Sequence, residues 1–262
     1  MKLILASAQD PAAKNIAARL LELYDFEKSS TLPNSYIYDQ VLLALVPGGV
    51  TQLASLPVDA DEVIVASRHA SESGKPSLTA HVSGELEKRQ LAVASPSTIK
   101  TAFQALIAAR DELGLPHEVS LEATHHGPTK LDVPVTFVEI GSSSEQWVDK
   151  KAGEAVARAI IAVASPAKCR NAVGLGGPHY APRHTEVTLR TDVGVGHILP
   201  KYARIDEELL EQAIVRTSGG VELLALDWKG TSGEQRAICQ TVADRLGIRV
   251  QRCREILAQA KV

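Results

Sequence analysis

Short aliphatic runs alternate with helical patterns along the whole chain. The first run, residues 2–7 (KLILAS), predicts a buried strand and is too short for the apolar core of a signal peptide. Asp10 and Pro11 then predict a helix start, with proline at the first helical position. Further strands are predicted over residues 41–46, 62–66, 91–94, 119–122, 136–140, 172–175 and 221–226. Such aliphatic runs are typical of strands covered on both faces.

Helices are predicted between most of these strands. They cover residues 12–24, 96–113, 142 onward, 206–216 and 231–246. Gly114 and Gly247 close two of them, and Ser142 with Glu145 predicts a capping box at the start of one long helix. Strands that alternate with helices predict a three-layer α/β/α fold with a mixed, largely parallel sheet. We expect a single domain over residues 1–262, with its weakest seam at 165–170.

Composition narrows the class of protein. Aromatic residues make up 4% and hydrophobic residues 45%, so the core must be built from Ala, Val, Leu and Ile. Apolar runs of bilayer length are missing from the sequence, which argues against a membrane partner. Cys169, Cys239 and Cys253 are too widely spaced for a CxxC pair, which favours a reducing cytoplasm. The net charge of −3 gives no sign of nucleic-acid binding, so a nucleic-acid partner would need a local basic patch.

Most of the eight histidines fall beside predicted strand ends. They are His69 and His81 in one loop, His125 and His126 in EATHHGPT, His179 in GLGGPHYAP and His197 in GVGHILPKYA, whereas His117 and His184 look incidental. Ligands of open α/β sheets gather outside the carboxyl ends of strands. The histidines therefore predict a site on strand-end loops.

Imidazoles with one or two carboxylates suit a zinc ion that keeps a position open for water. Glu122, Glu139 and Asp227 are the nearest carboxylates in the sequence. This chemistry would hydrolyse an ester or amide, with one of the paired His125 and His126 binding metal and the other orienting the substrate. The alternative is that single histidines are structural hydrogen-bonders and that the two glutamates pair with a buried arginine.

Cations beside glycine turns form a second candidate feature. DWKG places Lys229 between a strand and a helix start, where an anion such as phosphate can bind, although a plain capped turn fits equally well. Lys201 and Tyr202 in ILPKYA add a cation and an aromatic face, and Arg68 and Lys75 lie in the first histidine loop. The run GLGGPHYAP does not match GxGxxG and predicts a tight loop that presents backbone N–H groups.

Taken together, these segments resemble the archaeal/plant-type D-aminoacyl-tRNA deacylase family. The matching stretches are ASRHAS (66–71), LTAHVSG (78–84), EATHHGPT (122–129), FVEIGSSSEQW (137–147), GLGGPHYAP (174–182), GHILPKYA (196–203) and DWKG (227–230). The resemblance implies zinc-dependent hydrolysis of the ester that joins a D-amino acid to tRNA. It also implies an α/β fold akin to the phosphorylase/peptidyl-tRNA hydrolase group.

The resemblance and the residues together give a set of expected roles. We expect catalysis by His125, His126 and Glu122, metal binding among His69, His81, His125, Glu139 and His179, and tRNA phosphate binding by Arg68, Lys75, Lys201 and Lys229, with Lys130 and Arg183 as additions. The expected partner is D-aminoacyl-tRNA, with neither DNA nor a membrane. The number of metal ions and the oligomeric state, a monomer included, stay open. A nucleoside phosphorylase-like transferase and a non-catalytic RNA-binding module are the alternatives.

Overall fold

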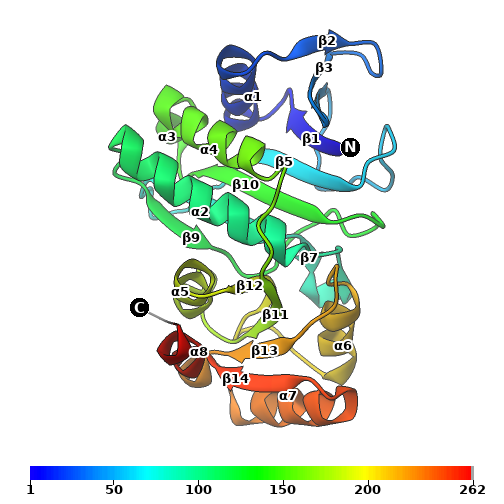
Figure 1. The fold of residues 1–262 in the computed structure, drawn as a ribbon, viewed down its shortest axis with the longest axis vertical. Helices are drawn as coiled ribbons and strands as arrows, with labels where there is room; N and C mark the ends of the chain where they lie inside the picture. Colours follow the sequence, from blue (N-terminus) through cyan, green and yellow to red (C-terminus); the bar gives the residue numbers. More distant parts are fainter. Residues whose placement is uncertain (261–262) are drawn as a thin grey trace.

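A computed structural model describes residues 1–260 and shows two main sheets, one above the other along the long axis (Figure 1). The larger sheet has eight strands in the order β2 (Glu27–Ser29), β3 (Ser35–Tyr38), β4 (Val41–Val46), β1 (Lys2–Ser7), β5 (Glu62–Arg68), β10 (Val135–Gly141), β6 (Ser77–Val82) and β9 (Glu118–Leu121). Strands β4, β1, β5 and β10 run parallel, and β6 pairs antiparallel to β10 but parallel to β9. The predicted mixed, largely parallel α/β fold is confirmed.

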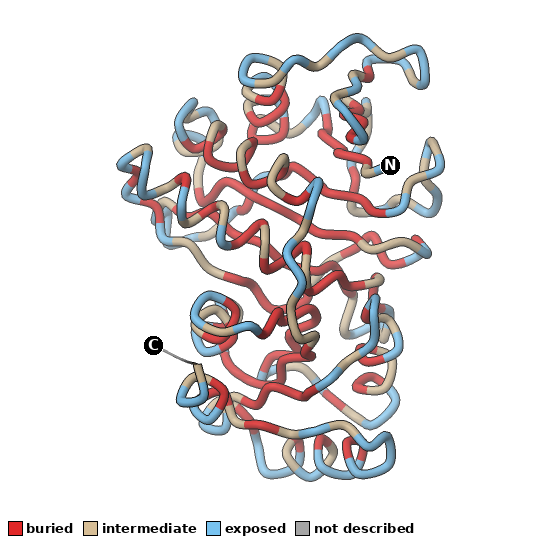
Figure 2. The backbone as a smooth tube through the Cα atoms, in the orientation of Figure 1, coloured by how far each residue is buried: buried red, intermediate tan, exposed pale blue. Residues whose placement is uncertain are grey.

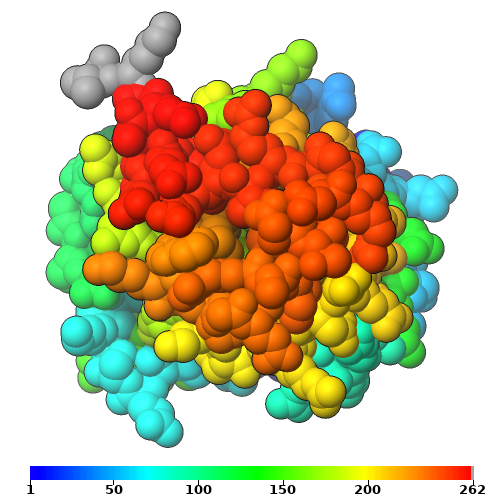
Figure 3. Space-filling view, turned by 90° about the horizontal axis from the view of Figure 1, so that it is seen from below, coloured from blue at the N-terminus to red at the C-terminus, as the bar shows by residue number. Residues whose placement is uncertain are grey.

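The smaller sheet is entirely parallel. Its four strands lie in the order β12 (Val193–Leu199), β11 (Arg170–Leu175), β13 (Leu223–Leu226) and β14 (Arg249–Arg252). The helices packed around it are α5 (Pro182–Arg190), α6 (Glu207–Val215), α7 (Gly233–Leu246) and α8 (Cys253–Gln259). In the view from below, α7 and α8 cover the end of the molecule that lies farthest from the large sheet (Figure 3).

Helices α1 (Pro11–Leu23), α2 (Pro96–Leu113) and α4 (Lys150–Ala162) pack side by side on the large sheet (Figure 1). Asp10 caps α1 as predicted, because its carboxylate accepts hydrogen bonds from the backbone of Ala12 and Ala13. Gly114 ends α2 with φ of 63°, a conformation that costs glycine little. The buried residues follow the strands through the middle of both sheets (Figure 2). Among the described residues, none of the helices has the length and apolar character needed to span a bilayer.

Two local predictions were wrong. The long helix expected from Ser142 is broken into α3 (Ser144–Trp147) and α4, and the capping box is formed by Ser143 and Gln146 instead of Ser142 and Glu145. The Ser142 hydroxyl instead donates to the Lys75 carbonyl, so it is not free to cap. The strand expected over 91–94 is reduced to β8 (Gln90–Leu91), which pairs with β7 (Gly84–Glu85) in a small ribbon.

Candidate active site

Two buried carboxylates form the centre of the site. Glu139 lies within β10, directly opposite Thr79 of β6, whose hydroxyl donates to Glu139 Oε2 at 3.4 Å. Glu122 is the first residue after β9, and its backbone N–H donates to the Ala80 carbonyl of β6. Their exposed fractions are 2% and 1%. Since burying a carboxylate is costly, both side chains require partners with positive character.

Four imidazoles surround these carboxylates. The distances are 3.0 Å from His69 Nδ1 to Glu122 Oε1, 3.6 Å from His81 Nε2 to Glu139 Oε2, 3.4 Å from His125 Nε2 to Glu122 Oε2, and 3.2 Å from His179 Nε2 to Glu122 Oε2. His69 Nδ1 also lies 3.8 Å from Glu139 Oε2 and so stands between both glutamates. His81 is further held by stacking on Phe137, the residue opposite it in β10, with ring centroids 5.0 Å apart.

The second nitrogen of each ring is anchored outside the cluster. His125 Nδ1 lies 2.8 Å from the Ala123 carbonyl and His81 Nδ1 lies 3.3 Å from the Val82 carbonyl. His69 Nε2 and His179 Nδ1 are hydrogen-bonded to the hydroxyls of Tyr180 and Tyr202, at 2.9 and 3.2 Å. A carbonyl only accepts, so His125 carries its proton on Nδ1 and directs the lone pair of Nε2 inward. Metal-binding histidines are oriented in this way.

The charges at the centre are unbalanced around Glu122. Burial opposes its ionisation, but the adjoining His179 ring and the charge of His81 outweigh burial and hold the pKa of Glu122 at about 2. Burial, together with His81 and His126, lowers the pKa of His125 to about 2. At neutral pH an ionised carboxylate therefore faces the lone pair of a neutral imidazole. Two acceptors in contact need a cation between them.

The residues at this centre fit a zinc ion, because a cation would lie between the ionised Glu122 and the lone pair of His125. Three overlapping groups have ligand atoms within 4.8 Å of one another: Glu122, His125 and His179; His81, His125 and His126; and His69, Glu122 and Glu139. Within residues 1–260 both carboxylate oxygens of Glu122 are buried without a hydrogen-bond partner. The first group joins two imidazoles and one carboxylate, a donor set found in catalytic zinc sites. Its His125 and His179 side chains are 28% and 34% exposed, so water can reach this group.

His126 lies beside the cluster and lines a cavity. Its φ of 39° is unusual for a residue with a side chain, and its Nδ1 lies 2.7 Å from the Gly127 carbonyl. Burial is the main cause of its lowered pKa, so His126 is neutral at neutral pH. A side chain at Gly127 would collide with the Thr51 carbonyl, which keeps this loop in place. The cavity has a volume of about 280 Å³ and is lined by Gly84, Glu85, Leu86, Glu87, Lys88, Thr124, His125, His126 and Tyr202.

The expectation that the histidines occupy strand-end loops was wrong at two positions. His81 lies within β6, and His197 lies within β12 and is fully buried. His197 Nε2 contacts the Ala92 carbonyl, and its Nδ1 lies 3.2 Å from Thr124 Oγ1, so this ring supports the residue that precedes His125. His184 is also buried outside the cluster, against the Gly176 carbonyl.

The predicted phosphate-binding cations lie on exposed segments. Lys201 and Lys229 flank the loop that carries His179, because the Lys201 N–H donates to the Gly177 carbonyl and the Gly177 N–H donates to the Gly230 carbonyl. Arg68 precedes His69, with its guanidinium 5.2 Å from the Trp147 ring centroid. The exposed positions also include Lys75, Lys130 and Arg183. Tyr180, the partner of His69, was missed, although it directly follows His179 in the GGPHY run.

Fold and cluster together define a class: an α/β protein whose two sheets meet at a histidine–carboxylate centre suited to hydrolysis. A family model described as D-aminoacyl-tRNA deacylase matches residues 56–251. The chain is 38% identical to a D-aminoacyl-tRNA deacylase of Thermococcus kodakarensis, over 95% of this chain and 98% of that protein. It is 37% identical to a D-aminoacyl-tRNA deacylase of Pyrococcus furiosus, with the same coverage.

A solved structure agrees with these relatives. The crystal structure of a conserved protein of unknown function superposes with a TM-score of 0.93 at 31% identity, covering 100% of this chain and 98% of the other. The chain belongs to the D-aminoacyl-tRNA deacylase family. This membership favours an ester hydrolase over both the phosphorylase-like transferase and the non-catalytic RNA-binding module.

Proposed function

We propose that this chain hydrolyses the ester bond of D-aminoacyl-tRNA, releases the free D-amino acid and tRNA, and uses zinc to do so. Its family relatives bear the name of this activity. The observation that carries the zinc proposal is the ionised Glu122 surrounded by His69, His125 and His179, with ring nitrogens directed inward. A deacylase acting on aminoacyl-tRNA would work in the cytoplasm, in agreement with the three unpaired cysteines.

Glu122, His125 and His179 would hold the zinc ion, which as a Lewis acid would polarise the ester carbonyl and acidify the attacking water. The 280 Å³ cavity beside His125 and His126 would receive the aminoacyl end of the substrate, with Tyr202 at its rim. An adenine ring can stack on such an exposed tyrosine, whose exposed fraction is 65%.

In this proposal, His126 moves the proton. Its Nδ1 faces a carbonyl, and its lowered pKa leaves Nε2 free to accept. Water attacks the ester carbon, its proton passes to His126 Nε2, and the same proton then goes to the ribose oxygen as the ester bond breaks. His69 stands between Glu122 and Glu139 and bonds the Tyr180 hydroxyl, so it fixes both carboxylates during this step.

The direct test is hydrolysis of matched D- and L-tyrosyl-tRNA by the purified protein, with and without a chelator. We expect release from the D substrate only, lost on chelation and restored by zinc. Selective release that survives chelation would overturn the zinc proposal and leave the imidazoles as acid–base groups. An absence of release from both substrates would overturn the deacylase.

A further inference from the structure

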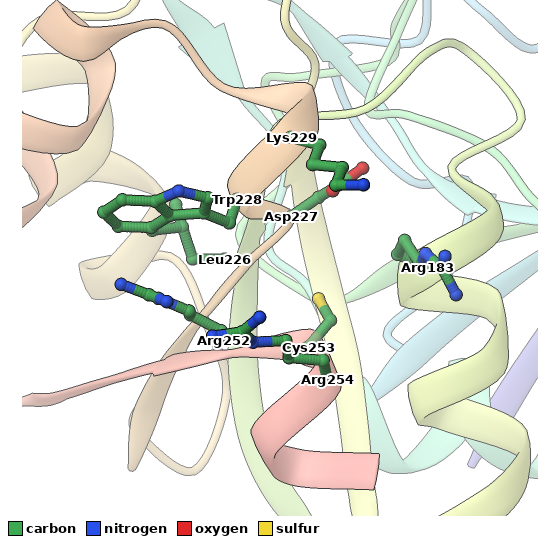
Figure 4. A pocket seen from close by; sticks show the side chains of 8 residues that line it. All are labelled: Arg183, Leu226, Asp227, Trp228, Lys229, Arg252, Cys253 and Arg254. Carbon is green, nitrogen blue, oxygen red and sulfur yellow. The ribbon is translucent and has the colours of Figure 1, made fainter.

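A second cavity lies at the carboxyl edge of the small sheet. Its volume is about 170 Å³, and it is lined by Arg183, Leu226, Asp227, Trp228, Lys229, Arg252, Cys253 and Arg254 (Figure 4). Three separate segments form its walls: the first turn of α5, the turn after β13 and the junction between β14 and α8. We name it the basic pocket.

The basic pocket concentrates positive charge in a chain whose net charge is −3. Four of its lining residues are cations and one is a carboxylate. One oxygen of that carboxylate, Asp227 Oδ1, accepts a hydrogen bond from the Gly230 N–H. Arg183 pairs with Glu186 and Arg252 pairs with Glu255, whereas within residues 1–260 the exposed Lys229 and Arg254 form no ion pair. These two unpaired cations attract an anion to the hollow, because they outnumber the one carboxylate of the lining, Asp227.

Trp228 and arginine side chains give the pocket a fixed wall. The guanidinium of Arg252 lies 3.8 Å from the Trp228 ring centroid, and that of Arg236 lies 4.3 Å from it. Arg236 is anchored in turn, because it donates to the carbonyls of Trp228 and Thr231. Figure 4 shows Arg252 lying along the indole, whereas the Lys229 side chain points away from both, toward the side where Arg183 lies. A stacked guanidinium loses less conformational freedom when it binds an anion.

The basic pocket is tied to the active site by one loop. The Gly177 N–H donates to the Gly230 carbonyl at 2.8 Å, and Gly230 directly follows Lys229. Gly176 has a φ of 90°, and a Cβ on it would lie 2.6 Å from the Gly230 carbonyl oxygen, so only glycine permits this contact. His179 lies two residues after Gly177 and contacts Glu122. The turn that carries Lys229 is therefore hydrogen-bonded to the loop that carries His179, the residue in contact with Glu122.

We propose that the basic pocket binds a backbone phosphate of the tRNA acceptor arm, upstream of the esterified 3′-terminal nucleotide. The inference rests on the proposed function. The cavity is smaller than sites that enclose whole small molecules, which span roughly 300–1,000 Å³, whereas a single phosphate group fits. Arginine and lysine contacts to phosphate position a nucleic acid without reading its sequence. The pocket thus holds every D-aminoacyl-tRNA in the same way, whichever amino acid it carries.

The test compares two substrates that share the reacting ester. One is D-tyrosyl-tRNA, and the other is D-tyrosyl-adenosine, which lacks the upstream phosphates. The double variant Lys229→Ala/Arg254→Ala should raise KM for D-tyrosyl-tRNA about tenfold and reduce the slope of log KM against log salt by about one for each phosphate that the variant no longer neutralises. Its kcat/KM for D-tyrosyl-adenosine should stay within twofold of the wild type.

Lys168→Ala/Arg249→Ala is the matched control. Both residues are exposed cations at the amino edge of the small sheet, so the variant loses the same charge at the opposite edge. The control should leave KM and the salt slope unchanged for both substrates. An equal rise of KM in the two double variants would overturn the basic pocket as a site, because the loss of positive surface charge alone would then explain the rise. An unchanged KM for the pocket variant would also overturn it. Failure of the proposed function would be distinguishable, because the wild type would then hydrolyse neither substrate.

Discussion

The large and small sheets contribute different kinds of residue to this protein. Glu139 and His81 lie inside strands of the large sheet, almost completely buried, and each has hydrogen-bonding neighbours in the sheet. The small sheet contributes His179 on a glycine loop, 34% exposed, and the exposed cations of the basic pocket.

Under the proposed function, this difference separates the chemistry from the binding of a large substrate. Reactive groups must be held in fixed positions, which buried strands do well, and a polyanion must be met at the surface, where loops present side chains. The loop between β11 and α5 joins the two roles, because the His179 carbonyl accepts from the Ala123 N–H and its ring contacts Glu122.

The largest expected effect comes from replacing a buried carboxylate at the large sheet. Glu122→Gln removes the negative charge that the imidazoles of His69, His125 and His179 share, so kcat for D-tyrosyl-tRNA should fall about 10³-fold. Glu118→Gln is the matched control, because Glu118 is exposed at the other end of β9. Rates are measured by release of the amino acid, with circular dichroism to verify folding. A decrease below tenfold would contradict a central role for Glu122.

The next effect concerns His197, which supports the junction of the sheets. Burial is the main reason that its folded-state pKa is lowered from 6.5 to about 4. The folded protein thus binds fewer protons than the unfolded chain between these values, so His197 contributes stability that is present above pH 6.5 and lost as pH falls toward 4. The contribution is on the order of 3 kcal/mol. Denaturant unfolding from pH 7 to pH 4 should show a shallower decline of stability for His197→Asn, and an identical slope would refute this account.

The smallest expected effect concerns the tyrosine behind His69. Tyr180→Phe removes the hydroxyl 2.9 Å from His69 Nε2, which orients the ring that stands between Glu122 and Glu139. The decrease in kcat should be about tenfold, as for groups that orient a metal-site residue. Tyr38→Phe, in β3 at the far side of the large sheet, is the control and should leave kcat unchanged. Equal rates for both variants would show that His69 needs no such support.

Local pattern was enough to predict most of the framework. Aliphatic runs marked the strands at 2–7 and 41–46, and capping residues such as Asp10 and Gly114 marked helix ends, because both signals act over a few residues. The break after Trp147 was not predictable, since the Trp147 and Asp149 carbonyls accept from the side chain of Asn15, which is distant in sequence. The relative direction of the strands could not be predicted from the sequence either. Glu122 meets Glu139 through His69 only because β6 and β9 run opposite to β10.

The number of histidines beside strand ends indicated a candidate site but did not show which of them belong to the cluster. His81 and His197 both follow alternating or glycine-rich apolar segments, and both proved to lie inside strands. Only the register of β6 against β10 places His81 beside Glu139, whereas β12 turns His197 toward Ala92. The register between two strands cannot be predicted from the spacing of residues along the sequence.

Zinc binding by the apo protein tests the central claim most directly. Competition titration should give tight binding for the wild type and for His117→Ala, whose ring is buried away from the cluster. His179→Ala removes one of the three inward ring nitrogens at Glu122, and its affinity should fall at least about 100-fold. Equal zinc affinity in His179→Ala and the wild type would contradict Glu122, His125 and His179 as the metal-binding group.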